Sequence, residues 1–133
     1  MKILFNEHPN KGFQRVGYCS YYGEIFYALE EVCEVISSCG VPSRTSEFGS
    51  GYDAIVMGFG HTDCGDAGPM PTVNDNNIPL FPILNKEYTG LKQKLEWIKN
   101  MKPTAALTVH HDTEEYSKIT GVPFNISIIK ILL

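Results

Sequence analysis

The sequence predicts an α/β fold, specifically a three-layer Rossmann-like sandwich with a mostly parallel sheet. Three observations lead to this prediction. Short apolar runs typical of strands covered on both faces recur along the chain, amphipathic helical patterns alternate with them, and all four histidines follow such runs. The length of 133 residues fits one compact domain, so residues 1–133 are expected to form a single Rossmann-like unit.

The first half of the chain predicts two strands, a helix and a loop. Met1–Phe5 (MKILF) is a short buried-strand run, and residues 9–20 have no periodicity and are expected to form the loop after it. From Tyr21 to Ser38 the apolar residues recur at steps of three and four, which predicts a helix that ends near Gly40. Ser43–Phe48 is polar and weakly alternating, which indicates a short second strand.

The next segments continue the alternation. Tyr52–Phe59 contains the apolar run AIVM of a buried strand, and residues 60–77 are a long aperiodic stretch of the kind that is usually functional or mobile. Ile78–Leu84 resumes as a strand, but its two prolines predict an edge or irregular position. Thr89–Lys102 has the apolar stripe of a helix, and Ala105–Val109 is another buried strand.

The last segments predict a helix and a final strand. Asp112 followed by Glu115 has capping-box spacing, so a third helix is expected to run to about Ile119 and to stop at Gly121. Val122–Leu133 begins as a strand and ends as an apolar string. An exposed string of this kind promotes aggregation, so we expect it to dock on the core or on another chain.

Composition excludes several classes of function. The net charge is −4 and no lysine or arginine cluster occurs, which argues against nucleic acid as a partner. No apolar run reaches the length of about 18 residues that a membrane span needs, and the first residues do not resemble a signal peptide, so a cytoplasmic protein is expected. The four cysteines match no zinc module and suggest no disulfide framework.

Polar residues gather after the predicted strands. If the sheet is parallel, these residues meet at its carboxyl edge, where ligands of open α/β sheets bind. Histidine can donate a hydrogen bond or move a proton near neutral pH, and arginine or lysine can offset a ligand's negative charge. Any one of these residues has an alternative role as a solvated loop position or a helix cap. The residues are Asn6, Glu7, His8, Arg15, Tyr18, His61, Asp63, Cys64, Asp66, Asn85, Lys86, Glu87, His110, His111 and Asp112.

Known cofactor motifs are not found. The loop Gly12–Gly17 lacks the G-x-G-x-x-G spacing and the Walker lysine-serine pair, so phosphate binding by a glycine-rich backbone is not predicted. His8, His61 and His110 with nearby carboxylates have the chemistry of a metal site, but no H-E-x-x-H or closed cysteine-histidine module occurs. We therefore expect neither a bound metal nor a cofactor.

Several segments together resemble one enzyme family. They are Ile3–Pro9, Asn85–Tyr88, Lys94–Lys99, Leu107–Asp112 and Tyr116–Phe124. In these segments the chain resembles the amino-terminal domain of GT-B glycosyltransferases, especially the spore-maturation-like branch related to family-4 enzymes. The resemblance covers most of residues 1–124.

The resemblance implies a division of labour between two Rossmann-like domains. The first domain mainly binds the sugar acceptor, the second holds the nucleotide sugar, and transfer occurs between them. It implies acceptor binding by Phe13–Tyr18 and an approach of His110 or His111 to the transferred sugar. The chain departs from the family after Phe124, where residues 125–133 replace the expected strand and turn and no second domain follows. We therefore expect a truncated half-domain that is inactive alone, or one completed by a second-domain partner.

Two alternatives belong to other classes of function. The first is a stand-alone α/β binding or regulatory module, flavodoxin-like in shape, which forms homo-oligomers through its apolar C-terminal segment. The second is a small metal-dependent hydrolase that uses His8, His61 and His110. Donor sugar, acceptor and stereochemistry are not encoded in any motif of the sequence.

Overall fold

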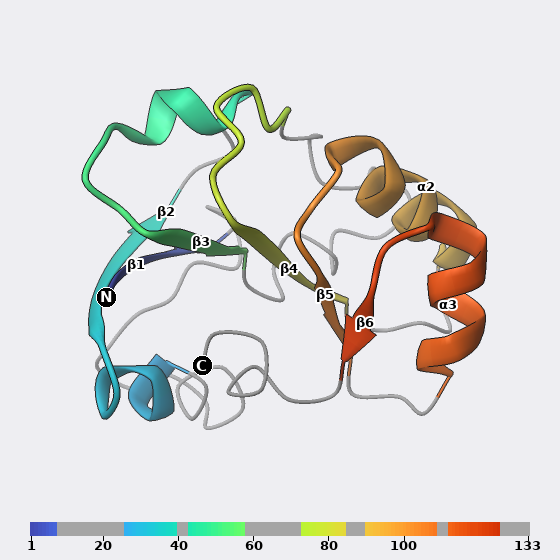
Figure 1. The fold of residues 1–133 in the computed structure, drawn as a ribbon, viewed down its shortest axis with the longest axis horizontal. Helices are drawn as coiled ribbons and strands as arrows, with labels where there is room; N and C mark the ends of the chain where they lie inside the picture. The colour runs from blue at the N-terminus through green and yellow to red at the C-terminus, as the bar shows by residue number, and fades with distance from the viewer. Residues whose placement is uncertain (8–25, 40–42, 58–72, 85–89, 109–111, 126–133) are drawn as a thin grey trace.

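The protein is described here by a computed structural model, in which residues 1–7, 26–39, 43–57, 73–84, 90–108 and 112–125 are placed. Their elements form an α/β fold with a six-stranded sheet (Figure 1). The strands are β1 (Lys2–Glu7), β2 (Glu34–Cys39), β3 (Ala54–Met57), β4 (Leu80–Leu84), β5 (Ala106–Thr108) and β6 (Phe124–Asn125). The helices are α2 (Leu91–Met101) and α3 (Thr113–Thr120), with a 3₁₀ turn, η2 (Thr45–Phe48), and helical residues 26–30.

The sheet is parallel at every pair of neighbouring strands. Its order is β2-β1-β3-β4-β5-β6, and the registers pair Leu4 with Ile36 and with Ile55, and Val56 with Phe81. This confirms the predicted Rossmann-like, three-layer architecture. It also confirms that the strands predicted from four apolar runs, β1, β3, β4 and β5, lie side by side and point the same way.

The apolar strands bury both faces because successive side chains point to opposite sides of a strand. On one face Leu4, Met57 and Leu84 pack with Trp97 and Ile98 of α2 and with α3. On the other face the helical residues 26–30 cover a second core, which contains Ile3, Phe5, Phe26, Leu29, Ala54, Val56, Phe81, Ile83, Ala105 and Leu107. The two cores make β1, β3, β4 and β5 the hydrophobic centre of the molecule.

The predicted helix over residues 21–38 is wrong in its second half. Helical structure among the described residues covers 26–30, and residues 34–39 form β2, which pairs with β1 along its whole length. Val32, placed on the buried stripe of the predicted helix, is 49% exposed. Pairing with β1 outweighs the helical spacing because Val35 and Ile36 are β-branched residues, which favour extended backbone.

The strand predicted at Ser43–Phe48 is also wrong. Arg44 makes a single parallel bridge to Val73, and Thr45–Phe48 then form η2. Side chains hold this turn, because Asp75 accepts hydrogen bonds from the backbone N–H and the hydroxyl of Ser46, at 3.0 and 2.6 Å. Local side-chain bonds of this kind compete with extended pairing in polar segments.

The edge position predicted for residues 78–84 is wrong as well, since β4 lies between β3 and β5. Along a parallel strand, the backbone groups of successive residues form hydrogen bonds alternately with the strand on one side and with the strand on the other. Leu80 faces the β5 side, where its N–H donates to Thr104 Oγ1 at 3.3 Å and its carbonyl accepts from the Thr104 N–H at 3.0 Å. Pro82 faces that same side, and pairing with β5 begins only at Ile83. A central strand therefore tolerates the proline.

The two C-terminal helices agree with the prediction. α2 ends at Met101 and is followed by Pro103. α3 ends at Thr120 and is capped by Gly121, which has a φ of 71° and donates its N–H to the Ser117 carbonyl at 2.8 Å. Asp112 occupies the N-cap position of α3 but makes no side-chain capping bond. Residues 126–133, the predicted apolar string, lie outside the described residues.

Candidate functional site at the carboxyl edge

The strand order creates one natural place for a ligand. From β1 the chain extends the sheet to β2 on one side and to β3, β4, β5 and β6 on the other, so the order reverses between β1 and β3. Ligands of open α/β sheets bind outside the carboxyl ends of the strands at such a reversal, because the loops there part and leave a crevice. The predicted location of the site therefore coincides with a feature of the observed topology.

The six strands end at this one edge because all of them are parallel. Their last residues are Glu7, Cys39, Met57, Leu84, Thr108 and Asn125. Three of the predicted strand-end residues are in the described part of the chain: Asn6 and Glu7 at the end of β1, and Asp112 at the N-cap of α3. The others lie outside it: His8, Phe13, Arg15, Tyr18, His61, Asp63, Cys64, Asp66, Asn85, Lys86, Glu87, His110 and His111.

The strands that precede these predicted residues lie at different distances from β1 along the edge. Neighbouring strands lie about 4.8 Å apart, so the segments that follow β1 and β3 begin about 5 Å from each other. The segment with His110 and His111 follows β5, which is three strand spacings, or about 14 Å, from β1. An extended ligand such as a sugar is long enough to contact both the β1–β3 end of this edge and its β5 end.

A buried polar pair lies next to the reversal. Asn6 of β1 is fully buried, and its Nδ2 donates to Ser38 Oγ of β2 at 3.1 Å. The other amide atom, Asn6 Oδ1, is buried and has no hydrogen-bond partner in the structure described. Such an acceptor carries a desolvation cost of about 1–3 kcal/mol, so native proteins keep few of them. Asn6 was named among the strand-end polar residues, but nothing in the sequence indicates its unpaired oxygen.

Lys94 is a buried charge on the buried side of α2, within the helix predicted over Thr89–Lys102. It lies in the first turns of α2, its backbone N–H donates to the Gly90 carbonyl at 3.1 Å, and the residue is buried. Because α2 follows β4, its N-terminus faces the carboxyl edge, and helical side chains lean toward the helix N-terminus. In the sequence, the one indication of this buried ammonium group is that the lysine is spaced like the apolar residues on the buried face of α2.

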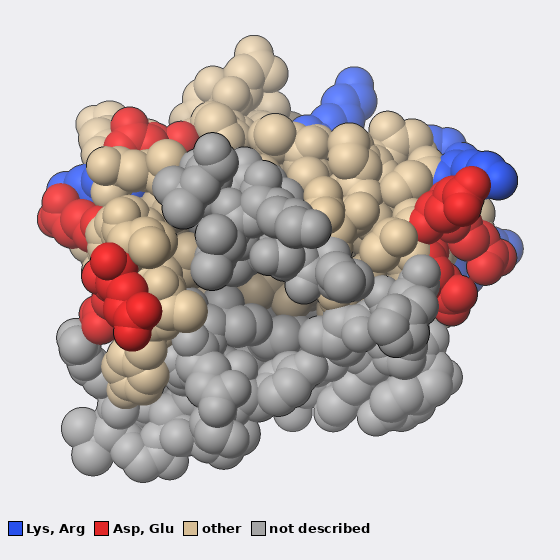
Figure 2. Space-filling model, turned by 60° about the horizontal axis from the view of Figure 1, so that its bottom comes forward, with Lys and Arg blue, Asp and Glu red and all other residues tan. Residues whose placement is uncertain are grey.

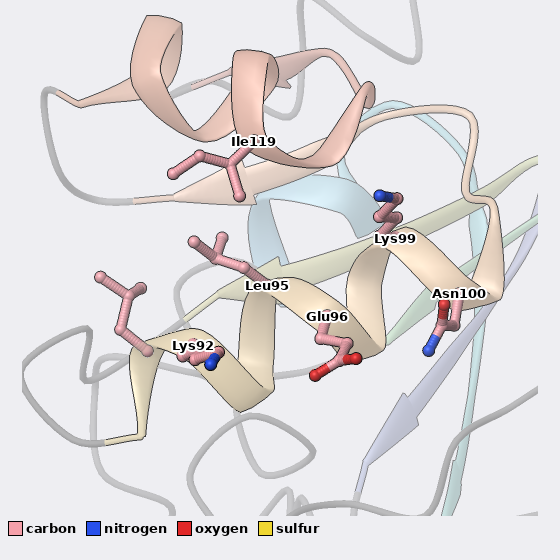
Figure 3. Close-up of a pocket in the computed structure, with 7 residues that line it drawn as sticks. Lys92, Leu95, Glu96, Lys99, Asn100 and Ile119 are labelled. Atoms are coloured by element: carbon pink, nitrogen blue, oxygen red, sulfur yellow. The ribbon is translucent and has the colours of Figure 1, made fainter.

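A surface groove of about 450 Å³ lies elsewhere, between α2 and α3 (Figure 3). Leu91 and Leu95 of α2 and Ile119 of α3 form its apolar part, and Lys92, Glu96, Lys99 and Asn100 of α2 complete its lining. All its polar side chains come from one exposed helix face, so they do not converge on a ligand as the polar groups of a binding site do. We therefore place the candidate site at the carboxyl edge and not in this groove.

Charged and nucleophilic groups offer no competing centre in the described part of the chain. No group of three or more metal-binding side chains is found among the described residues. Burial raises the pKa of the Cys33 thiol, which contacts the Leu29 carbonyl at 3.2 Å, so this cysteine is not an activated nucleophile. Figure 2 shows acidic side chains at both ends of one face and no basic patch among its described residues.

Comparisons with known proteins add no further assignment. No family model, curated protein or solved structure significantly matches the chain. None of the helices described is both long enough and apolar enough to cross a membrane.

Proposed function

We propose that this protein binds a sugar acceptor at the carboxyl edge of its sheet and serves as the acceptor-side domain in sugar transfer from a nucleotide sugar. The observation that carries the proposal is the reversal of strand order between β1 and β3. The resemblance to the amino-terminal domain of GT-B glycosyltransferases assigns acceptor binding to the same edge, at which the polar residues that follow the strands also gather.

The proposal gives each group of predicted residues a task. Glu7 and His8 follow one another at the end of β1, and His61 and Asp63 follow β3, so these four contact the acceptor. Phe13, Arg15 and Tyr18 line the acceptor side, and Lys86 and Glu87 extend it beyond β4. His110 and His111, which follow β5, face the sugar being transferred. Nucleotide-sugar binding belongs to a second domain, because the resemblance places it there.

Ligand binding by the purified chain tests this proposal. We expect saturation-transfer NMR to detect sugars, such as simple methyl glycosides, at millimolar concentrations or below. We expect UDP- and GDP-sugars to bind at least tenfold more weakly than the best acceptor sugar. Glu7→Gln is expected to weaken sugar binding, whereas Glu31→Gln is the matched control, since Glu31 is exposed on the turn before β2 at the opposite edge. The proposal would be contradicted if the nucleotide sugars bound tightly, or if no sugar bound at all.

A second candidate is a stand-alone binding or regulatory module. The order β2-β1-β3-β4-β5 is that of flavodoxin-like sheets, which bind a ligand at the same reversal without a second domain. If the protein is such a module, a ligand binds at the carboxyl edge but no sugar is transferred when a donor domain and a nucleotide sugar are added. Sugar transfer that requires this chain would favour the acceptor-side domain over the stand-alone module.

A further inference from the structure

The pair formed by Asn6 and Ser38 presents one free acceptor and one free donor at the end of the sheet. Asn6 Oδ1 is buried and unpaired in the described structure, while Asn6 Nδ2 donates to Ser38 Oγ at 3.1 Å. Ser38 Oγ accepts that bond, so its own hydrogen is left to donate elsewhere. A half-turn of the Asn6 amide exchanges the two roles but again leaves one donor and one acceptor in the pair.

A hydroxyl group has the matching chemistry, because it donates one hydrogen bond and accepts another. A carboxylate or phosphate only accepts, and would leave the acceptor of the pair unsatisfied. An ammonium group only donates, and would leave the donor unsatisfied. The pair therefore favours a neutral ligand rich in hydroxyl groups over an anion or a cation.

The position of the pair connects it with the candidate site. Asn6 is in register with Ser38 on one side and with Met57 on the other, so it lies at the reversal between β1 and β3. Asn6 is fully buried, whereas Ser38 is half-buried and belongs to β2, which is the outermost strand on that side of the sheet. A ligand hydroxyl would thus reach the pair from the Ser38 side.

We propose that Asn6 and Ser38 form a specificity-determining hydroxyl subsite, in which Asn6 Oδ1 accepts from a hydroxyl of a bound sugar or polyol and Ser38 Oγ donates to the same oxygen. This inference rests on the proposed function, since it concerns the ligand of the same edge. It adds the chemical class of the group recognised and the two residues that recognise it. A ligand that lacks this hydroxyl leaves the Asn6 acceptor and the Ser38 donor unpaired, so the subsite discriminates against it.

A panel of methyl glycosides and their monodeoxy analogues tests the subsite by calorimetry. The wild-type protein is expected to bind one monodeoxy analogue roughly tenfold or more weakly than its parent. Ser38→Ala is expected to reduce this discrimination to roughly twofold, and Ser38→Thr, which keeps the hydroxyl, to preserve most of it. Ser37→Ala is the matched control, because Ser37 is exposed and its side chain points to the opposite face of β2.

Asn6→Leu separates recognition from stability. The substitution removes an unpaired buried acceptor and supplies an apolar side chain of similar size, so we expect the thermal midpoint to stay within a few degrees of wild type while discrimination is lost. If discrimination survives in Ser38→Ala and Asn6→Leu, the subsite is overturned although the proposed function stands. If the wild-type protein binds none of the glycosides, the proposed function fails, and the subsite fails with it.

Discussion

The described residues differ widely in what their substitution is expected to do, and burial decides the difference. Ile98 of α2 is fully buried in the core between the sheet and the helices α2 and α3, while Ile119 of α3 is 53% exposed. Both are isoleucines on helices of the same layer. They therefore allow the same substitution to be compared in two environments.

Ile98→Ala is expected to lower the free energy of unfolding by about 2–5 kcal/mol, because the lost methyl and methylene groups leave a cavity in a packed core. Ile119→Ala is the matched control and is expected to change it by no more than about 0.5 kcal/mol. Urea denaturation of the two variants measures both values. Equal effects would show that α2 does not pack on the sheet as described.

Asp75 makes stability depend on pH. The Ser46 hydroxyl and the Ser46 N–H both donate to this carboxylate, and they hold its pKa below the ordinary value. A carboxyl whose pKa is lower in the folded state stabilises the fold above the unfolded pKa, and this contribution is lost as the pH falls through the folded pKa.

Asp75→Asn is therefore expected to be less stable than wild type at pH 7, with a difference that shrinks as the pH falls below about 4. Thermal unfolding from pH 7 to pH 2.5 measures this trend. Glu31→Gln, on an exposed turn, is expected to follow the wild-type curve. A difference between Asp75→Asn and wild type that persists unchanged at pH 2.5 would rule out the ionised carboxylate as its source.

At the scale of elements, the sequence predicted the buried strands and the two C-terminal helices more closely than the segments between them. AIVM and LFPIL are strands because they are apolar on both faces. α2 follows from its apolar stripe, and α3 follows from the capping-box spacing of Asp112 and Glu115 and from the glycine at 121. The helix predicted over Tyr21–Ser38 was wrong in its second half because the apolar residues at 29, 32, 33 and 36 fit a helical spacing. In the structure, pairing with β1 makes residues 34–39 a strand. That pairing is a long-range interaction with no local signal.

Gly121 provides a test of how α3 ends. Its φ of 71° is unfavourable for residues with a Cβ, although an added Cβ would meet nothing within 4 Å. Gly121→Ala is expected to cost about 1 kcal/mol of stability through backbone strain alone. Gly121→Asn is expected to cost less, since asparagine tolerates this conformation. Denaturant melts give both values, and a neutral Gly121→Ala would contradict the left-handed helix end.

At the scale of the whole molecule, the parallel sheet is what joins the sequence pattern to a site. Apolar runs followed by polar residues predicted that the strand ends share one edge, and the observed order confirms it. The sequence did not predict that the reversal falls between β1 and β3, because that depends on which strand β2 joins. Nor did it predict the unpaired Asn6 oxygen or the burial of Lys94, which depend on packing between distant segments.

Amide chemical-shift mapping of the ¹⁵N-labelled protein with the best-binding methyl glycoside is the sharpest test of the proposed ligand site at the carboxyl edge beside β1 and β3. If the sugar binds there, the largest shifts fall at the carboxyl ends of the strands, at Asn6, Ser38 and Met57. Shifts that concentrate at the amino ends, at Lys2 and Ala54, or in the α2–α3 groove around Leu95 and Lys99 would overturn the proposed site.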